Sequence, residues 1–242
     1  MDSVLGFYLW GYGNVASADY ILGKMRESYP TSDLVISSDA GEDFSTIAEK
    51  YNAIKYIHGS VSHGYPPSAD RYGWTADQFL IWIERLYTAC QAINNDYVML
   101  MEEDLLVKER FRFPAAGIIM IPNIKNPISQ TGMKWIASRE GRTDYPYYSA
   151  GGGSIINKNK FIQAYENHLE DLLKNYETIF QQSFLEGIRG WGWNDSLICV
   201  LMYAEKASIS TELPILESGN EDDPAPIIHK FKKYYNNLTH GA

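Results

Sequence analysis

The sequence contains little cysteine and no long hydrophobic run. Only two of its 242 residues are cysteines, Cys90 and Cys199, and both lie in apolar stretches typical of helices. Two such cysteines fit neither a disulfide framework nor a zinc site, so we interpret them as buried free thiols. No apolar run approaches the roughly 20 residues of a membrane span. The first residues lack the basic segment of a signal peptide, so we expect a cytoplasmic protein.

Basic residues are also scarce. Lys and Arg together number 21 against 30 for Asp and Glu, which gives a net charge of −9. This balance argues against nucleic acid or an anionic membrane as the main partner. Apolar residues make up 45% and charged residues 21%, as in ordinary folded domains rather than disordered ones. Aromatic residues, at 14%, are plentiful and suit either core packing or stacking on sugar rings.

The first quarter of the chain alternates between apolar segments typical of strands and amphipathic segments typical of helices. The strands are expected at Val4–Trp10, Leu34–Ile36 and Ala53–His58, and the helices at Ala16–Tyr29 and Phe44–Tyr51. This alternation predicts an α/β fold with a parallel sheet and right-handed crossovers. Thr75 and Gln78 then form a capping box, which predicts a further helix whose apolar face extends to Ile93.

The next expected strand, Tyr97–Met101, ends in three consecutive acids, Glu102, Glu103 and Asp104. Ligands of open α/β sheets bind at the carboxyl ends of the strands, which is where these acids fall. Crowded carboxylates repel one another unless a cation or a proton relieves the charge, and a hard divalent metal prefers oxygen ligands. Glu102 and Asp104 point the same way on a strand, whereas Glu103 faces away. A polar turn after a core strand is the alternative interpretation.

The pattern beyond Asp104 is less regular. Strands are expected at Trp135–Ser138, before Ile156 and at Ile209–Leu213, and helices at Lys160–Glu186 and Ser196–Glu205. Three consecutive glycines, Gly151, Gly152 and Gly153, allow the backbone to approach a ligand closely or to form a special turn. A flexible loop has the same composition, and that alternative stays open.

Four motifs occur in an order typical of a known enzyme fold: Asp39 after the second strand, Glu102-Glu103-Asp104 after the fourth, the glycines at 151–153, and Gly190-Trp191-Gly192-Trp193-Asn194-Asp195. In this order they resemble the GT-A glycosyltransferases, which transfer a sugar from a nucleotide-diphosphate donor to a hydroxyl acceptor. The resemblance covers most of the chain and identifies no family within the fold.

The resemblance implies a single domain over residues 1–242 with a Rossmann-like, mostly parallel central sheet flanked by helices. It places a nucleotide-binding half at residues 1–107 and an acceptor-side, catalytic half at residues 108–242. It also implies a UDP- or GDP-sugar as donor, and a glycan, glycoprotein or other hydroxyl compound as acceptor.

The acidic motif is the metal site that the resemblance implies. Asp104 is the expected direct ligand, while Glu102 departs from the usual Asp and supports the metal or approaches it through water. His229 stands where some members of the fold place a histidine ligand. An imidazole ligand favours Mn²⁺ over Mg²⁺ because it is a softer donor than a carboxylate. The alternative for His229 is an ordinary residue at a strand edge.

Asp195 is the expected catalytic base of an inverting mechanism, in which a carboxylate takes the proton of the attacking hydroxyl. It falls at a predicted helix start, where the dipole favours the ionised form. Helix capping alone would also explain an acid there. Capping does not explain Trp191 and Trp193, whose flat faces suit stacking on a sugar.

The remaining candidate residues would bind the donor. Asp39 suits a uracil imide or a ribose hydroxyl, Arg71 suits the phosphates or the acidic motif, and Lys230 suits the diphosphate. Glu102 and Glu103 belong to this nucleotide-binding set through the acidic motif. Each of these residues has a plainer alternative as part of a turn, a surface or a solvated tail.

Two other functions compete with glycosyl transfer. A sugar-1-phosphate nucleotidyltransferase shares a similar first half and an acidic metal site. That class is marked by a basic, Gly-rich loop after the first strand, whereas Gly11-Tyr12-Gly13-Asn14 has no Lys or Arg. The second alternative is a non-catalytic carbohydrate- or nucleotide-binding module of the same fold, against which the intact acids Asp104 and Asp195 argue mildly.

Overall fold

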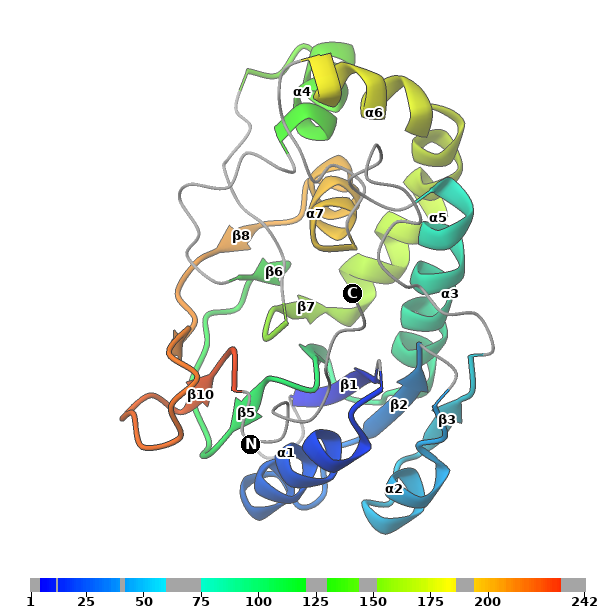
Figure 1. Ribbon diagram of the computed structural model, residues 1–242. Coiled ribbons are helices and arrows are strands. Elements are labelled where there is room, and N and C mark those ends of the chain that lie inside the picture. The colour runs from blue at the N-terminus through cyan, green and yellow to red at the C-terminus, as the bar shows by residue number, and fades with distance from the viewer. Residues whose placement is uncertain are drawn as a thin grey trace.

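The computed structural model describes residues 5–11, 13–39, 42–59, 75–120, 130–143, 152–185 and 194–231. Its first half alternates strands and helices as the sequence predicts (Figure 1). The elements are β1 (Leu5–Gly11), α1 (Val15–Ser28), β2 (Leu34–Ser38), α2 (Ser45–Lys50), β3 (Lys55–Ile57), α3 (Ala76–Ala92) and β4 (Tyr97–Met101). The capping box of Thr75 and Gln78 is present at the start of α3 and confirms that prediction. Every residue of β1 and β2 is buried, as expected for strands covered on both faces.

The central sheet has seven strands in the order β3-β2-β1-β4-β7-β6-β8. Its second half comprises β6 (Ile118–Ile119), β7 (Ile155–Asn157) and β8 (Ile209–Ser210). The pairings of β1 with β2 and β4, of β2 with β3 and of β6 with β8 are parallel. β7 is antiparallel to both β4 and β6. The predicted mostly parallel α/β sheet is therefore confirmed.

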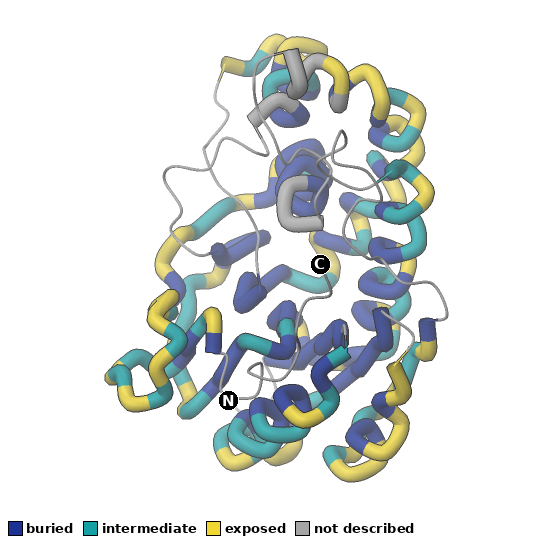
Figure 2. Tube along the Cα trace, in the orientation of Figure 1, coloured by how far each residue is buried: buried dark blue, intermediate teal, exposed yellow. Residues whose placement is uncertain are grey.

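Helices cover both faces of this sheet. Residues two apart on a strand point to the same face, so Tyr8 and Trp10 of β1 join one core while Phe7 and Leu9 join the other. The first core also contains buried residues of α3, α5 (Lys158–Lys174), α7 (Asn194–Ala204) and α4 (Gln130–Glu140). The second contains those of α1 and α2. Figure 2 shows the buried residues concentrated in the strands and on the inner sides of the helices.

Two predicted elements of the second half are wrong. Trp135–Ser138 is not a strand but part of α4. The buried residues Met133, Ile136 and Ala137 have the spacing of a helix face, which the short apolar run did not reveal. The predicted single helix at Lys160–Glu186 is two helices, because α5 ends at Lys174 and α6 (Tyr176–Leu185) follows. Asn175 closes α5, since its backbone N–H and its Nδ2 both donate to the carbonyl oxygen of Asp171.

A second, smaller sheet lies on the α1 side of the molecule. It contains β5 (Leu106–Val107), β10 (Ile227–Ile228) and β9 (Ile215–Leu216), in the order β5-β10-β9. β10 is antiparallel to β5 and parallel to β9. The residues of β5 and β10 are fully buried in the same core as α1. These two-residue strands carry no periodic pattern, and the sequence did not predict them.

The expectation that both cysteines are buried thiols is met. Cys90 and Cys199 are both buried thiols, and burial raises the pKa of the Cys90 thiol above its ordinary value. Among the described helices, we find none with the length and apolar character needed to cross a membrane.

Candidate active site

The three acids after β4 diverge at the carboxyl edge of the central sheet. The amide of Leu105 donates to the carbonyl oxygen of Glu102 at 3.1 Å, so the chain turns tightly between β4 and β5. Within this turn Glu103 is only 4% exposed, whereas Glu102 and Asp104 are partly exposed. The side chains of Glu102 and Asp104 are therefore the ones that reach a potential ligand.

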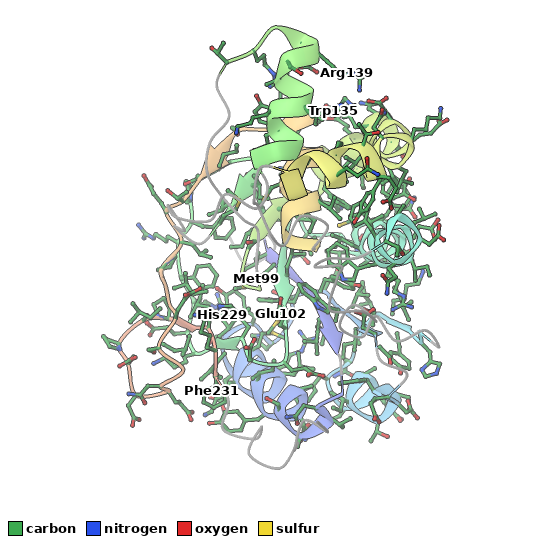
Figure 3. All side chains as sticks on the ribbon, turned by 45° about the horizontal axis from the view of Figure 1, so that its top comes forward. Met99, Glu102, Trp135, Arg139, His229 and Phe231 are labelled. Carbon is green, nitrogen blue, oxygen red and sulfur yellow. The ribbon has the colours of Figure 1, made fainter. Side chains whose placement is uncertain are left out.

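The small sheet brings His229 to this turn from the far end of the chain. Ile228 of β10 pairs with Leu106 of β5, and beyond the pairing the amide of Phe231 donates to the carbonyl oxygen of Asp104 at 2.9 Å. His229 Nε2 consequently lies 3.6 Å from Asp104 Oδ1. Figure 3 shows Glu102 and His229 side by side above α1.

Glu102, Asp104 and His229 form an acidic cluster that could hold a metal ion. Each residue offers one ligand atom, and these atoms lie within 4.8 Å of one another. Asp104 Oδ1 and His229 Nδ1 are buried and have no hydrogen-bond partner within the described part of the chain. Buried polar atoms are normally satisfied, so Asp104 Oδ1, which faces the cluster, indicates a missing ligand. Two carboxylates and an imidazole fit Mn²⁺, or Mg²⁺ with less preference.

Glu217 lies behind His229 and was not identified from the sequence. Its Oε1 is 3.6 Å from His229 Nδ1, and its Oε2 accepts a hydrogen bond from Lys230 Nζ at 2.9 Å. This hydrogen bond lowers the pKa of the Glu217 carboxyl below its ordinary value. An ionised carboxylate beside Nδ1 favours a proton there and leaves Nε2 to face Asp104. In sequence Glu217 is only the first acid of a loop, and no signal distinguished it.

Lys230 is expected to contact the diphosphate, which stays a prediction, and in the structure its Nζ donates a hydrogen bond to Glu217 Oε2. Its backbone has a φ of +63°, in the left-handed region, and its carbonyl oxygen lies close to Gly219. The side chain is about half exposed, so the salt bridge to Glu217 is screened by solvent. The structure thus places Lys230 beside the cluster, as a partner of Glu217.

The glycine segment contacts the acidic motif directly. A Cβ atom on Gly152 would lie 2.9 Å from Glu102 Cδ, so a side chain at this position would displace the Glu102 carboxylate. Gly153 has a φ of +96°, which a residue with a side chain rarely adopts. Its amide donates to the carbonyl oxygen of Leu100 at 2.7 Å and aligns the chain with β4. Ser154 Oγ, buried next to this turn, has no partner among the described residues.

Glu103 points away from the cluster and toward the start of α1. Its Oε1 accepts hydrogen bonds from the backbone amides of Gly13 at 2.8 Å and Asn14 at 2.9 Å. Its carbonyl oxygen accepts a hydrogen bond from Ser17 Oγ at 2.6 Å. The carboxylate expected among the nucleotide-binding residues is therefore engaged inside the fold.

Asp39 lies at the carboxyl end of β2 and is 3% exposed. Arg85 of α3 donates from Nη1 to Asp39 Oδ1 at 2.5 Å and to the carbonyl oxygen of Ser38 at 3.0 Å. Gly59 makes room for the guanidinium, because a Cβ atom there would lie 2.4 Å from Arg85 Nη2. Arg85 was not predicted from the sequence, because it looks like any charged residue of an amphipathic helix. Its burial and its partner become evident only in the fold.

Several candidate residues fall outside the described residues, namely Arg71, Gly151, Trp191 and Trp193. Asp195 is the second residue of α7, so its backbone stands at a helix start as expected. The orientation of its side chain is not described. The catalytic assignment of Asp195 therefore stays a prediction.

A separate cavity of about 250 Å³ lies between α4, α5 and α7. Its lining includes Trp135, Arg139, His168 and Asp171, together with aliphatic side chains of the three helices. Arg139 Nη1 donates to Asp171 Oδ2 at 2.5 Å, and His168 Nε2 lies 3.2 Å from Glu205 Oε2. Figure 3 shows Trp135 and Arg139 far from Glu102 and His229. This cavity is thus distinct from the acidic cluster.

No protein-family model matches the sequence, and no curated protein matches it. Among solved structures, the chain is similar to the galactosyltransferase LgtC, solved with donor and acceptor sugar analogues. That alignment has a TM-score of 0.52 and 11% sequence identity, and covers 92% of this chain and 86% of LgtC. The glycosyltransferase GlyE of Streptococcus pneumoniae aligns with a TM-score of 0.50 and 11% identity, over 94% of this chain and 55% of GlyE. The chain therefore adopts the GT-A fold of nucleotide-sugar glycosyltransferases.

Proposed function

We propose that this protein is a metal-dependent glycosyltransferase that moves a sugar from a UDP- or GDP-sugar to a hydroxyl acceptor. The observation that carries the proposal is the cluster of Glu102, Asp104 and His229 at the carboxyl edge of a GT-A sheet. The buried atom Asp104 Oδ1, which has no hydrogen-bond partner among the described residues, supports a cation at this place.

The cluster would hold a divalent cation through Asp104 and His229, with Glu102 beside them. When bound, such a cation supplies positive charge against the negative charge that gathers on the departing nucleotide diphosphate. Glu217 would hold the ring of His229 in the required orientation from behind. Gly152 lets the backbone pass beside Glu102 without displacing its carboxylate.

Asp195 would act on the acceptor. The acceptor oxygen forms a bond to C1 of the sugar, the bond from C1 to the diphosphate oxygen breaks, and the hydroxyl proton passes to the Asp195 carboxylate. Such a single displacement inverts the configuration at C1. The position of Asp195 in the first turn of α7 favours its ionised form, which is the form that accepts a proton.

The donor would extend from the cluster along the carboxyl ends of the strands. Asp39, oriented by Arg85, would accept a hydrogen bond from the base or the ribose. Arg71 would meet the phosphates, and Trp191 and Trp193 would stack on a sugar. The turn at Gly13 and Asn14 argues against a nucleotidyltransferase, because its two amides already bind Glu103.

A thermal-shift screen of nucleotide diphosphates and nucleotide sugars, with and without Mn²⁺, tests this function. We expect UDP or GDP to raise Tm only together with Mn²⁺, since a ligand at 100 times its Kd stabilises the folded state by about 2.7 kcal/mol. The absence of any shift with all nucleotide diphosphates and Mn²⁺ would overturn the proposal. A shift without any release of nucleotide diphosphate from a nucleotide sugar, with a panel of acceptors, would indicate the non-catalytic binding module.

A further inference from the structure

We propose that Glu103, the middle acid of the motif, is a positioning residue. It fixes the turn that contains Glu102, Glu103 and Asp104, called here the metal-binding turn, against the start of α1. It stands between Glu102 and Asp104 in sequence but contributes no atom to their cluster. Its side chain reaches the turn between β1 and α1 instead. The statement that the turn after β4 binds a metal rests on the proposed function.

The contacts of Glu103 are buried and specific. One carboxylate oxygen accepts both backbone amides, at 2.8 Å from Gly13 and 2.9 Å from Asn14, and the residue is 4% exposed. Its carbonyl oxygen accepts the hydroxyl of Ser17, one turn into α1. Hydrogen bonds to a charged acceptor are about twice as strong as neutral ones, and a buried site makes their loss more costly. Side chain and backbone of Glu103 are therefore both attached to α1.

The first turn of α1 has no acidic residue of its own. Asn14 caps the helix by accepting the amide of Ser17. A carboxylate near a helix N-terminus is favoured by the helix dipole. Glu103 supplies this charge from the turn after β4, the strand that neighbours β1.

This contact has a consequence for the donor. In doubly wound folds, the turn between the first strand and the first helix is where backbone amides bind phosphate groups. In this protein the amides of Gly13 and Asn14 bind the chain's own carboxylate. The donor diphosphate is then left to the acidic cluster, and its binding should depend strongly on the cation.

The metal-binding turn is held from two sides. Glu103 attaches it to α1, and the amide of Phe231 attaches the carbonyl oxygen of Asp104 to the segment after β10. The carboxylates of Glu102 and Asp104 can converge on His229 only while both attachments hold this turn. Loss of Glu103 should lower metal affinity about 10- to 100-fold, as loss of a residue that orients metal ligands does elsewhere.

Replacement of Glu103 by alanine removes Cγ and the carboxylate, which correspond to the carbon and oxygen atoms of an acetate ion. Added acetate can therefore take the place of the missing side chain. Mn²⁺ affinity is measured by calorimetry for the wild type, Glu103→Ala, Glu103→Gln and the matched control Glu109→Ala, whose glutamate is exposed. We expect Glu103→Ala to bind Mn²⁺ about 10- to 100-fold more weakly and sodium acetate to restore most of the loss. Sodium chloride at the same ionic strength should not restore it, and Glu109→Ala should match the wild type.

The outcomes separate a positioning role from a purely structural one. If Glu103 serves stability alone, its variants lose Tm but the folded protein binds Mn²⁺ like the wild type, which would overturn the inference. A folded Glu103→Ala whose Mn²⁺ affinity falls but does not respond to acetate would also overturn it. If Glu103→Ala does not fold, the isosteric Glu103→Gln decides, because it removes the negative charge that the two amides bind: weaker Mn²⁺ binding than in the wild type supports the inference, and wild-type affinity overturns it.

Failure of the proposed function would look different. A wild type that binds no Mn²⁺ would contradict the metal site and leave the contact of Glu103 with α1 in place. That contact is then tested without metal, because acetate should raise the Tm of Glu103→Ala and leave that of the wild type unchanged. Equal effects of acetate on both proteins would overturn the contact itself.

Discussion

Two regions of this protein collect charged side chains, and they differ in how well these are satisfied. At the carboxyl edge of the sheet, Asp104 Oδ1 and His229 Nδ1 are buried and accept or donate no hydrogen bond within the described part of the chain, and their charged neighbours His229 Nε2 and Glu217 Oε1 lie 3.6 Å away. In the cavity between α4, α5 and α7, Arg139 is paired with Asp171, and His168 with Glu205. Both regions contain a histidine beside a glutamate, so composition alone would not tell them apart.

The difference indicates which region is built for a ligand. Each buried polar atom without a hydrogen bond lowers the free energy of unfolding by about 1–3 kcal/mol. Such atoms are therefore expected where a bound ligand satisfies them. Half-exposed pairs such as Arg139–Asp171 need no ligand, because solvent and the partner satisfy them.

The largest expected effect is that of Asp104→Ala. Removal of the expected direct ligand should abolish the Mn²⁺-dependent binding of UDP or GDP, measured by calorimetry. The control Asp171→Ala removes an acid from the cavity and should leave this binding unchanged. Wild-type-like binding by Asp104→Ala would refute the metal assignment.

Arg85→Met should have the largest effect on stability. It leaves Asp39 buried without its partner, and breaking a buried pair costs about 3–5 kcal/mol in the free energy of unfolding. Arg139→Met breaks a pair of the same 2.5 Å length whose side chains are half exposed. That change should cost about 0–1 kcal/mol. Urea denaturation of both variants measures the contrast, and equal losses would contradict it.

Asp195→Asn should affect turnover and spare donor binding. Loss of a general base lowers kcat about 10²- to 10⁴-fold, whereas the affinity for the nucleotide should stay close to that of the wild type. The control is Asp77→Asn, which removes an acid from the first turn of α3. Full activity of Asp195→Asn would exclude it as the base and favour a mechanism that retains configuration.

His229→Ala should weaken Mn²⁺ binding at least about 100-fold, because it removes an expected direct ligand of the metal. Loss of a residue that only orients a ligand lowers metal affinity by up to about 100-fold, and loss of the ligand itself should cost no less. His168→Ala is the matched control, since His168 also lies beside a glutamate but belongs to the cavity. Calorimetric titration with Mn²⁺ distinguishes the two variants. Equal affinities would show that His229 is a structural residue.

Glu217→Gln should have the smallest effect. The amide no longer holds the His229 ring by charge, so Mn²⁺ affinity should fall about 10-fold, the lower end for a residue that orients a ligand. Glu205→Gln changes the corresponding glutamate beside His168 and should have no effect on Mn²⁺ binding. An unchanged affinity of Glu217→Gln would remove Glu217 from the site.

The first half of the fold was predictable because its signals are local. The alternating segments up to β4 and the capping box at Thr75 follow from propensity and periodicity within each element. In the second half, Trp135–Ser138 was misread because four residues are too few to separate a strand from a helix face. The break at Asn175 was missed because the apolar stripe continues across it.

The sequence by itself determined where the acids stand: at the end of a buried strand, after a capped helix, in an α/β alternation. Only the tertiary structure decided their partners. His229 reaches Asp104 through two-residue strands that leave no trace in periodicity, and Glu217 reaches His229 through the same sheet. Glu103 turns to α1 because β4 lies beside β1. Such pairings join distant segments, and local propensity contains no information about which distant segments meet.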